Sequence, residues 1–237
     1  MSIIIPGDQL PVDETTLNSK KLTVGPSIYV DPLLDNQMTI SNAGIFTHKE
    51  KKTKQLITVE SSSKNYIPAV GDLIVGTVLG GFGEFFKVSL SNYKPPAILS
   101  YMAFENATKK NRPNLKTGSL VYARISAYDP NIDVELECFN PTTGKAEGFG
   151  ELTGGTVVEV DLGFARYLMF NENNPVLEHL SKKCQFEIAI GVNGKVWIKG
   201  GDLVTTLACC QYIEQAQRLA SGELEQLLKK LWKQHNI

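Results

Sequence analysis

The stretch Pro68-Ala69-Val70-Gly71-Asp72-Leu73-Ile74-Val75-Gly76-Thr77-Val78 decides the fold of this chain. It starts with residues that favour a turn and continues as an alternating strand. Four more runs further along have the composition of strands, and they are residues 85–90, 97–100, 118–125 and 133–138. A long excursion separates the third of the five strands from the fourth. This arrangement predicts an OB-fold, a small Greek-key barrel that binds oligonucleotides on its second and third strands and on its loops.

The residues before this barrel predict a separate N-terminal β domain. Short strand-like runs alternate there with Pro, Gly, Asp and Asn, at residues 27–30, 38–41, 44–48 and 55–59. Residues 48–54 lie between two of these runs and carry four lysines, so they are expected to form a hairpin tip. The lysines could contact phosphate, or the tip could be a solvated loop.

The residues after the barrel predict an α/β domain. We expect strands at residues 156–160, 186–190 and 195–198, and helices at residues 164–169, 175–183, 202–219 and 221–235. Asp202 and Ser221 are suited to cap the last two helices, because their side-chain oxygens can accept from free backbone N–H groups. The order β-α-α-β-β-α matches a KH-type RNA-binding domain.

The fold class is therefore a multidomain chain, mostly β with an α/β C-terminus. We predict three domains: an N-terminal β domain at 1–63, a five-stranded OB-fold barrel at 64–148 and a KH-type α/β domain at 149–237.

Composition excludes several classes of protein. A net charge of −1 over 237 residues gives no global basic field, so any RNA-binding surface must be a local patch. The four cysteines form no C-x-x-C pair, which indicates reduced, mostly buried thiols rather than disulfides or a metal site; they are Cys138, Cys184, Cys209 and Cys210. We expect no cofactor, no metal, no signal peptide and no membrane-spanning helix.

A charge asymmetry marks the local patch. Residues 85–128 hold seven basic side chains and one acid, Glu105, whereas residues 129–161 hold eight acids and one lysine. We predict phosphate contacts from a polar loop that carries Lys109, Lys110 and Arg112. Further RNA-binding cations in the same stretch are Lys87, Lys116 and Arg124. A solvated surface loop is the alternative.

Aromatic residues interleave with these cations and could stack on bases. They are Phe85, Phe86, Tyr93, Tyr101 and Tyr122. Aromatic residues that alternate in strands also pack into cores, so packing is the alternative for each of them.

The segment Gly191-Val192-Asn193-Gly194 is predicted to be structural. It lies between two strand-like runs, and Asn-Gly at such a place favours a tight hairpin turn. KH domains that clamp RNA do so with a G-x-x-G loop between two helices. Residues 170–175 occupy that position here and contain no glycine pair. The KH domain is therefore expected to pack against its neighbours, with Gly191, Asn193 and Gly194 in a structural motif.

Catalytic motifs are weak. Asp133, Glu135 and Glu137 share one face of a strand and could serve a metal or acid–base chemistry, but carboxylates on a solvent face are the alternative. The segment Gly80-Gly81-Phe82-Gly83 lacks the Gly-Lys-Ser/Thr ending of a phosphate-binding loop and is expected to be a bend. The apolar stripe of residues 221–235 could bind a partner or close the domain core. The chain is predicted not to be an enzyme.

The ordered domains and motifs resemble the cap subunits of the eukaryotic RNA exosome, which have a β-rich N-terminal domain, an OB domain of the ribosomal S-one type and a KH domain. The motifs that carry the resemblance are Pro6-Gly7-Asp8, Pro68 with Gly71-Asp72, Gly191-Val192-Asn193-Gly194, Ser100-Tyr101-Met102-Ala103-Phe104 and Lys109-Lys110-Asn111-Arg112-Pro113. The last two are similar to the component-three type of cap subunit.

This resemblance implies a non-catalytic RNA-binding subunit. Its partners would be RNA, a ring of six RNase PH-like subunits and other cap subunits, and its place the nucleus, nucleolus and cytoplasm. It would stabilise the ring and guide RNA into 3′-to-5′ degradation and rRNA processing. A free-standing OB–KH factor of translation or ribosome biogenesis, and a purely architectural adaptor, are the alternatives.

Overall fold

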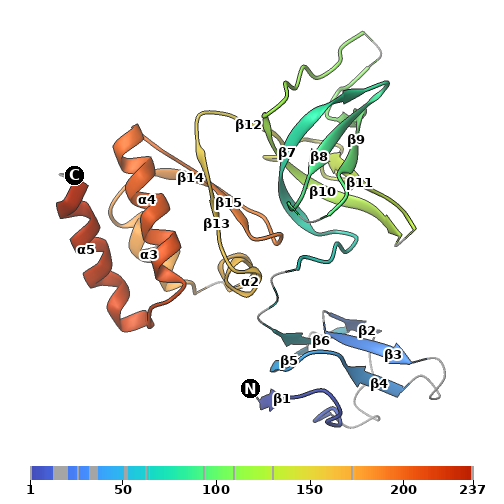
Figure 1. Ribbon diagram of the computed structural model, residues 1–237, viewed down its shortest axis with the longest axis vertical. Helices are drawn as coiled ribbons and strands as arrows, with labels where there is room; N and C mark the ends of the chain where they lie inside the picture. Colours follow the sequence, from blue (N-terminus) through green and yellow to red (C-terminus); the bar gives the residue numbers. More distant parts are fainter. Residues whose placement is uncertain are drawn as a thin grey trace. The chain divides into compact units, whose positions relative to one another are not determined.

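A computed structural model describes residues 2–12, 21–25, 27–31, 37–50, 53–61, 63, 65–92, 94–108, 110–129, 131–171 and 173–235. The chain separates into two compact units, Met1–Ser63 and Lys64–Ile237 (Figure 1). The second unit contains both the predicted barrel and the predicted KH-type domain. The boundary at 148/149 inside this unit stays a prediction.

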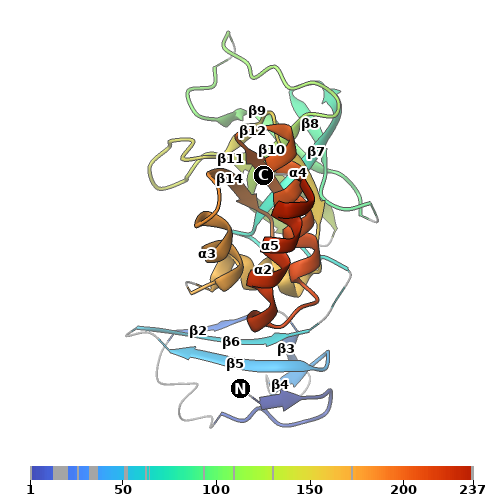
Figure 2. The ribbon, with the colours of Figure 1, turned by 90° about the vertical axis from the view of Figure 1, so that its left-hand side faces the viewer.

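The first unit is a β domain built from a sheet and a hairpin. The sheet has the order β1-β5-β6-β2, from strands β1 (Ser2–Ile4), β5 (Gly44–Glu50), β6 (Lys54–Glu60) and β2 (Lys21–Val24). The hairpin pairs β3 (Ile28–Asp31) with β4 (Gln37–Ile40). Figure 2 shows β5 and β6 running side by side. Buried residues from β1, β3, β4, β5 and β6 form a small core of Ile4, Ile28, Ile40, Phe46, Ile57 and Val59.

Two features of this unit differ from the sequence expectations. Strands β1 and β2 were not predicted, because each is too short to show alternation. The hairpin tip expected at residues 48–54 contains fewer residues in the structure, because strand β5 extends to Glu50 and strand β6 starts at Lys54. Lys51 and Lys52 lie outside the described residues.

The barrel has five strands in a closed arrangement and a sixth at its edge. The strands are β7 (Leu73–Phe82), β8 (Phe85–Ser89), β9 (Ala97–Phe104), β10 (Leu120–Asp129), β11 (Ile132–Cys138) and β12 (Gly150–Leu152). Their order is β11-β9-β8-β7-β10-β12, and an additional pairing of β11 with β10 closes the barrel. The predicted OB-fold is confirmed, and β12 is an addition that the sequence did not reveal.

The alternation of buried and exposed side chains along the strands shows which residues form the core of the barrel. Phe86 and Val88 of β8 are buried, whereas Phe85 and Lys87 between them are exposed. Gly76 on the neighbouring strand makes room for this core, since a Cβ there would overlap the Val88 side chain.

The predicted bend at Gly80–Gly83 is wrong. The pairing register of β7 and β8 shifts between Val78 and Gly80, which is typical of a β-bulge, and β7 then continues to Phe82. Only Gly83 and Glu84 remain in the turn, and Gly83 has a φ of +61°.

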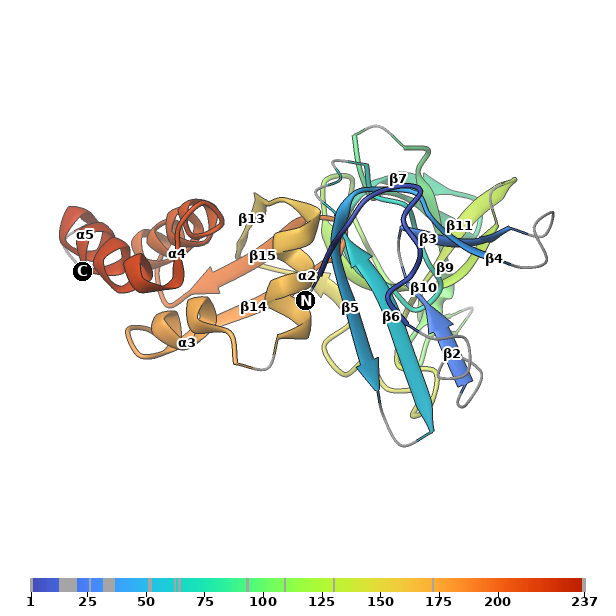
Figure 3. The same ribbon diagram turned by 90° about the horizontal axis from the view of Figure 1, so that it is seen from below.

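The C-terminal part is the predicted KH-type α/β domain. Its elements are β13 (Thr156–Glu159), α2 (Leu162–Phe170), α3 (Pro175–Ser181), β14 (Phe186–Ile190), β15 (Lys195–Gly200), α4 (Leu203–Ala216), the 3-10 turn η1 (Ser221–Glu223) and α5 (Leu224–His235). The sheet order is β13-β15-β14. Figure 3 shows α4 and α5 packed side by side. Both the element order and the fold class are confirmed.

One of the two predicted helix caps is confirmed, and the side chain of the other, Ser221, lies outside what the structure describes. Asp202 Oδ1 accepts a hydrogen bond of 2.7 Å from the Thr205 backbone N–H, so it caps α4. Ser221 lies within the 3-10 turn that precedes α5, and that turn begins after Ala220.

The apolar stripe of the last helix closes the domain core. The stripe is buried together with residues of α4 such as Tyr212 and Ile213, and it consists of Leu224, Leu227, Leu228, Leu231 and Trp232. The interpretation of this stripe as a partner-binding face is therefore wrong.

A buried asparagine joins the KH-type domain to the barrel. Asn193 lies in the turn between β14 and β15, and it is 7% exposed. Its Oδ1 accepts from Val75 N–H at 3.2 Å, and its Nδ2 donates to the carbonyls of Val75 at 2.9 Å and Leu90 at 2.8 Å. The adjacent Val192 N–H donates to Leu73 O at 2.9 Å. The amide thus makes three hydrogen bonds to two barrel segments.

The glycines of this turn make the close approach possible. Gly194 has a φ of +79°, which a residue with a Cβ rarely adopts. A Cβ on Gly191 would lie 2.6 Å from the Val75 nitrogen and would overlap Asn193 Oδ1. The turn is therefore a packed junction between domains.

We predict that Asn193→Ala lowers the free energy of unfolding by about 3 kcal/mol, because it leaves one buried N–H and two buried carbonyls without their partner. Urea unfolding followed by circular dichroism measures this change. Asn131→Ala is the matched control, since Asn131 is exposed and its backbone N–H, which the substitution keeps, donates to Asp129 Oδ1 at 2.8 Å. Equal stability of the two variants would contradict the role of Asn193.

Candidate nucleic-acid interface

The end of the β7–β8 hairpin presents two aromatic rings to solvent. Phe82 and Phe85 face each other across the turn as cross-strand partners. Phe82 is 73% exposed and Phe85 is 44% exposed. Because the next residue, Phe86, points into the barrel, Phe85 must point outward. Exposed aromatic rings on an OB barrel are typical platforms for unpaired bases.

A lysine stands over one of these rings. Lys87 follows Phe85 by two residues, so both side chains lie on the outer face of β8. The Lys87 Nζ lies 5.4 Å from the centroid of the Phe82 ring, which is within the range of a cation–π contact. The outer side of the hairpin therefore combines two stacking surfaces with a cation that can contact phosphate.

A second cation–aromatic pair lies on the other side of the same hairpin. Tyr101 of β9 packs against Phe86 with ring centroids 4.4 Å apart. The Arg112 guanidinium carbon lies 5.8 Å from the centroid of the Tyr101 ring. Because Phe86 and Phe85 point to opposite sides of β8, the two cation–aromatic pairs flank the hairpin from both sides.

The excursion between β9 and β10 carries the predicted phosphate contacts. Two hydrogen bonds between Thr108 and Asn111, of 3.1 and 3.0 Å, close a short turn that contains Lys110. Lys110, Arg112 and Lys116 are exposed. Lys109 lies outside the described residues. The predicted cations of this loop that the structure describes are therefore accessible to a phosphate backbone.

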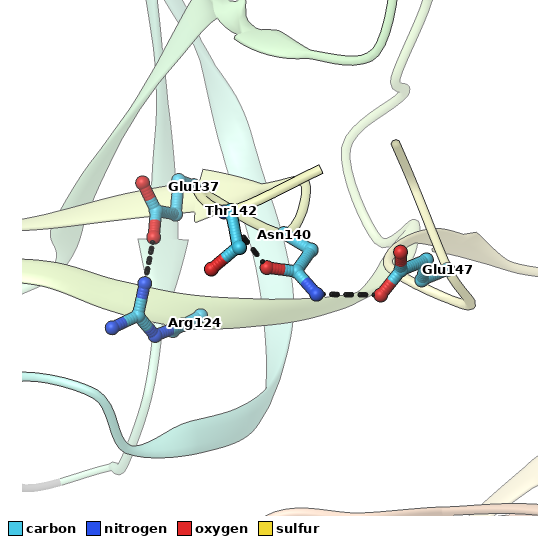
Figure 4. Close-up of polar contacts among 5 residues, drawn as sticks. All are labelled: Arg124, Glu137, Asn140, Thr142 and Glu147. Atoms are coloured by element: carbon cyan, nitrogen blue, oxygen red, sulfur yellow. Dashed lines mark hydrogen bonds and ion pairs between the residues drawn. The ribbon is translucent and has the colours of Figure 1, made fainter. Parts of the chain in front are cut away.

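Arg124 is separated from this group. It lies on β10 opposite Leu73, the first residue of β7, whereas Phe82 is the last residue of that strand. Ten residues of strand place these two positions about 30 Å apart. Arg124 Nη1 also lies 2.6 Å from Glu137 Oε1 (Figure 4). A phosphate would have to displace a half-buried carboxylate to reach this guanidinium.

The sequence patterns do not single out Phe82, because they place it in a glycine-rich bend and not on a strand. A signal was present nonetheless: Phe86 and Val88 alternate with Phe85 and Lys87, and a turn at Gly83-Glu84 makes Phe82 the partner of Phe85. Counting outward from the buried positions would have placed both rings on the outer face.

The candidate catalytic carboxylates do not converge on a site. Asp133 and Glu135 are exposed, and Glu137 is occupied by Arg124. Among the described residues, no group of three or more His, Cys, Asp or Glu side chains could hold a metal ion. No described helix is both long and apolar enough to cross a membrane.

The thiols do not form a disulfide. All four cysteines are free, although Cys184 Sγ and Cys209 Sγ are 3.6 Å apart. The contact with Cys209 lowers the pKa of Cys184, and burial raises the pKa of Cys138 to about 12.

The connection between α2 and α3 does not form a glycine clamp. Asn174 there is buried and accepts from Val176 N–H at 3.0 Å, which caps α3. Its Nδ2 donates to Leu168 O at 3.4 Å. The side chain is thus used for local structure, as expected from the absence of a glycine pair.

An OB barrel with outward aromatic rings, joined by a buried asparagine to a KH-type domain, defines a class of nucleic-acid-binding protein. Residues 66–150 match the family model described as the S1 domain of exosome complex component RRP40. Residues 155–203 match a KH domain model.

Relatives match almost the whole chain. The exosome complex component RRP40 of Saccharomyces cerevisiae is 42% identical over 236 residues, covering 98% of this chain and 96% of its own length. The Schizosaccharomyces pombe protein of the same name is 36% identical over 237 residues, with the same two coverages. The human one is 30% identical, covering 83% of this chain and 72% of its own length. The chain therefore belongs to the RRP40 family of exosome complex components, as the resemblance predicted.

A solved structure supports the fold. It is provisionally described as an exosome complex RNA-binding protein and matches with a TM-score of 0.54 at 19% identity. The match covers 72% of this chain and 97% of the other chain.

We predict that Phe82→Ala weakens binding of single-stranded RNA about 10-fold at every salt concentration, because a stacked base loses its neutral aromatic partner. Fluorescence anisotropy with a labelled oligonucleotide measures the affinity. Phe170→Ala is the matched control, since Phe170 is 53% exposed and lies in the KH-type domain.

The cations should behave differently in the same titration. A variant with Lys109→Ala, Lys110→Ala and Arg112→Ala should flatten the dependence of log K on log salt by about 2, because three phosphate contacts are lost. An unchanged slope, or an equal loss in Phe170→Ala, would contradict this assignment of the RNA surface.

Proposed function

We propose that this chain is a non-catalytic, RNA-binding cap subunit of the RNA exosome, which stabilises the ring of RNase PH-like subunits and guides RNA into 3′-to-5′ degradation and processing, including rRNA processing. The observation that carries the proposal is the aromatic and cationic end of the β7–β8 hairpin, on the S1-type barrel of an RRP40 family member. Membership of that complex implies residence in the nucleus, nucleolus and cytoplasm.

The proposed RNA path needs no sequence readout. Bases stack on Phe82 and Phe85, because every base has a π face. Phosphates contact Lys87, Lys110 and Arg112, with Lys109 and Lys116 in the same loop, and such contacts position a strand without reading it. Arg124 stays a prediction of the sequence, since it would have to exchange Glu137 for phosphate.

In this proposal the nuclease chemistry belongs to other subunits. The carboxylates of β11 do not converge on one site, and Glu137 is paired with Arg124. The buried side chains of Asn193 and Asn174 are used in hydrogen bonds that hold the KH-type domain together and to the barrel. A guide with several weak contacts suits a substrate that must slide past it, because tight binding would hold the RNA in place.

The partners distinguish this proposal from its alternatives. We predict that the tagged chain, purified from its own cells, brings RNase PH-like subunits and other cap subunits in near-equal amounts, as measured by quantitative mass spectrometry. Recovery with ribosomes, or with RNA and no stable protein partner, would favour a free-standing factor of translation or ribosome biogenesis. Recovery with the ring, but with RNA routing unchanged in Phe82→Ala, would favour an architectural adaptor.

A further inference from the structure

A cavity of about 430 Å³ lies where the barrel meets the KH-type sheet. Tyr122, Glu151 and Leu152 line it from the barrel, and Glu187, Ile188 and Trp197 line it from the sheet. We refer to this cavity as the junction pocket. It shares no lining residue with the β7–β8 hairpin, so the proposed RNA surface does not account for it.

A free strand edge borders the junction pocket. Strand β14 is the last strand in the order β13-β15-β14. Gly191 N–H donates to Lys195 O at 2.9 Å, so the alternate residues Ile190 and Ile188 direct their backbone groups away from β15. The Ile190 carbonyl accepts from the Tyr122 hydroxyl at 3.3 Å. Within the described part of the chain, no hydrogen bond engages the outward N–H and C=O of Ile188. An extended peptide is the ligand that such an edge pairs with.

Carboxylates surround the pocket. Glu147, Glu151 and Glu187 all line it. Hydrogen bonds from Thr143 and Asn140 lower the pKa of Glu147, so this carboxylate is ionised at neutral pH. Figure 4 shows Asn140 reaching Glu147. Lys199 lies 3.4 Å from Glu187 and offsets one of the three charges. The excess negative charge repels phosphate and attracts a cationic side chain.

Aromatic rings also line the pocket. Tyr122 is held by a stacked contact with Phe149, with ring centroids 5.4 Å apart. Trp197 also lines the pocket, although the residue as a whole is only 4% exposed. Aromatic rings beside carboxylates form an environment suited to guanidinium or ammonium groups.

We propose that the junction pocket binds an extended basic segment of a partner protein, whose backbone pairs with Ile188 and whose arginine or lysine side chain lies among the three glutamates. A free polyamine would satisfy the carboxylates but would not pair with the backbone N–H of Ile188, and RNA would be repelled by the carboxylates. Only a peptide supplies cations and carbonyl acceptors together. This inference goes beyond the proposed function and does not depend on RNA binding.

The test uses the full chain and a fluorescein-labelled peptide in which arginine alternates with β-branched residues, since this composition favours an extended strand. Fluorescence anisotropy at low salt should show saturable binding. The variant with Glu147→Gln, Glu151→Gln and Glu187→Gln should bind at least about 10-fold more weakly, because the attraction of the cationic side chain is lost. The peptide with glutamate in place of arginine should not bind.

A matched variant controls for net charge. Asp133→Asn, Glu135→Gln and Glu214→Gln remove three exposed acids that do not line the pocket, and they should leave the affinity unchanged. In a Trp232→Phe chain, Trp197 is the single tryptophan left of two. The fluorescence of Trp197 should then change over the same range of peptide concentrations as the anisotropy. Agreement of the two titrations would place the peptide at the pocket.

Three outcomes would overturn the proposal. The first is the absence of saturable binding at millimolar peptide. The second is equal affinity in the two triple variants, which would indicate general attraction to an acidic surface. The third is displacement of the peptide from the Phe82→Ala variant by single-stranded RNA, which would make the pocket an RNA site.

Discussion

The hydrogen bonds of the Asn193 side chain are the constraint on which the second unit depends. One amide engages Val75 of β7 and the Leu90 carbonyl that follows β8, at distances of 2.8 to 3.2 Å. A buried amide with three partners is stable only when all three are present, because each unpaired group carries the cost of desolvation. The turn therefore fixes the KH-type sheet against the first two strands of the barrel. The junction pocket exists because these two sheets meet at that place.

The same barrel strands carry the proposed RNA surface at their other end. Residues of β8 that point inward anchor the hairpin in the core, and those that point outward leave Phe85 and Lys87 in solvent. The chain thereby separates two kinds of surface by charge. Cations and exposed rings gather at the hairpin and the excursion, whereas Glu147, Glu151 and Glu187 gather at the junction. On the two proposals made above, RNA and a basic protein segment would bind the same unit without competing.

Local patterns were enough to predict most of the fold. Alternation, turn residues and helix signals gave the five barrel strands and the KH-type order, and the Asn-Gly pair gave the hairpin turn, since each depends on near neighbours. Contacts between distant residues could not be predicted. Asn193 binds Val75, which is 118 residues away. Arg124 and Glu137 were assigned to separate surfaces, yet the register of β10 and β11 makes them partners. The bulge between Val78 and Gly80 likewise leaves no mark in composition, so the continuation of β7 to Phe82 was not predicted.

The measurement that tests the central claim most directly is ultraviolet crosslinking of single-stranded RNA to the assembled complex that contains this chain, with the crosslinked residues identified by mass spectrometry. The account predicts crosslinks at the β7–β8 hairpin and in the excursion between β9 and β10. Crosslinks confined to the α2–α3 connection or to the junction pocket would contradict it, as would RNA that enters the complex without contacting this chain.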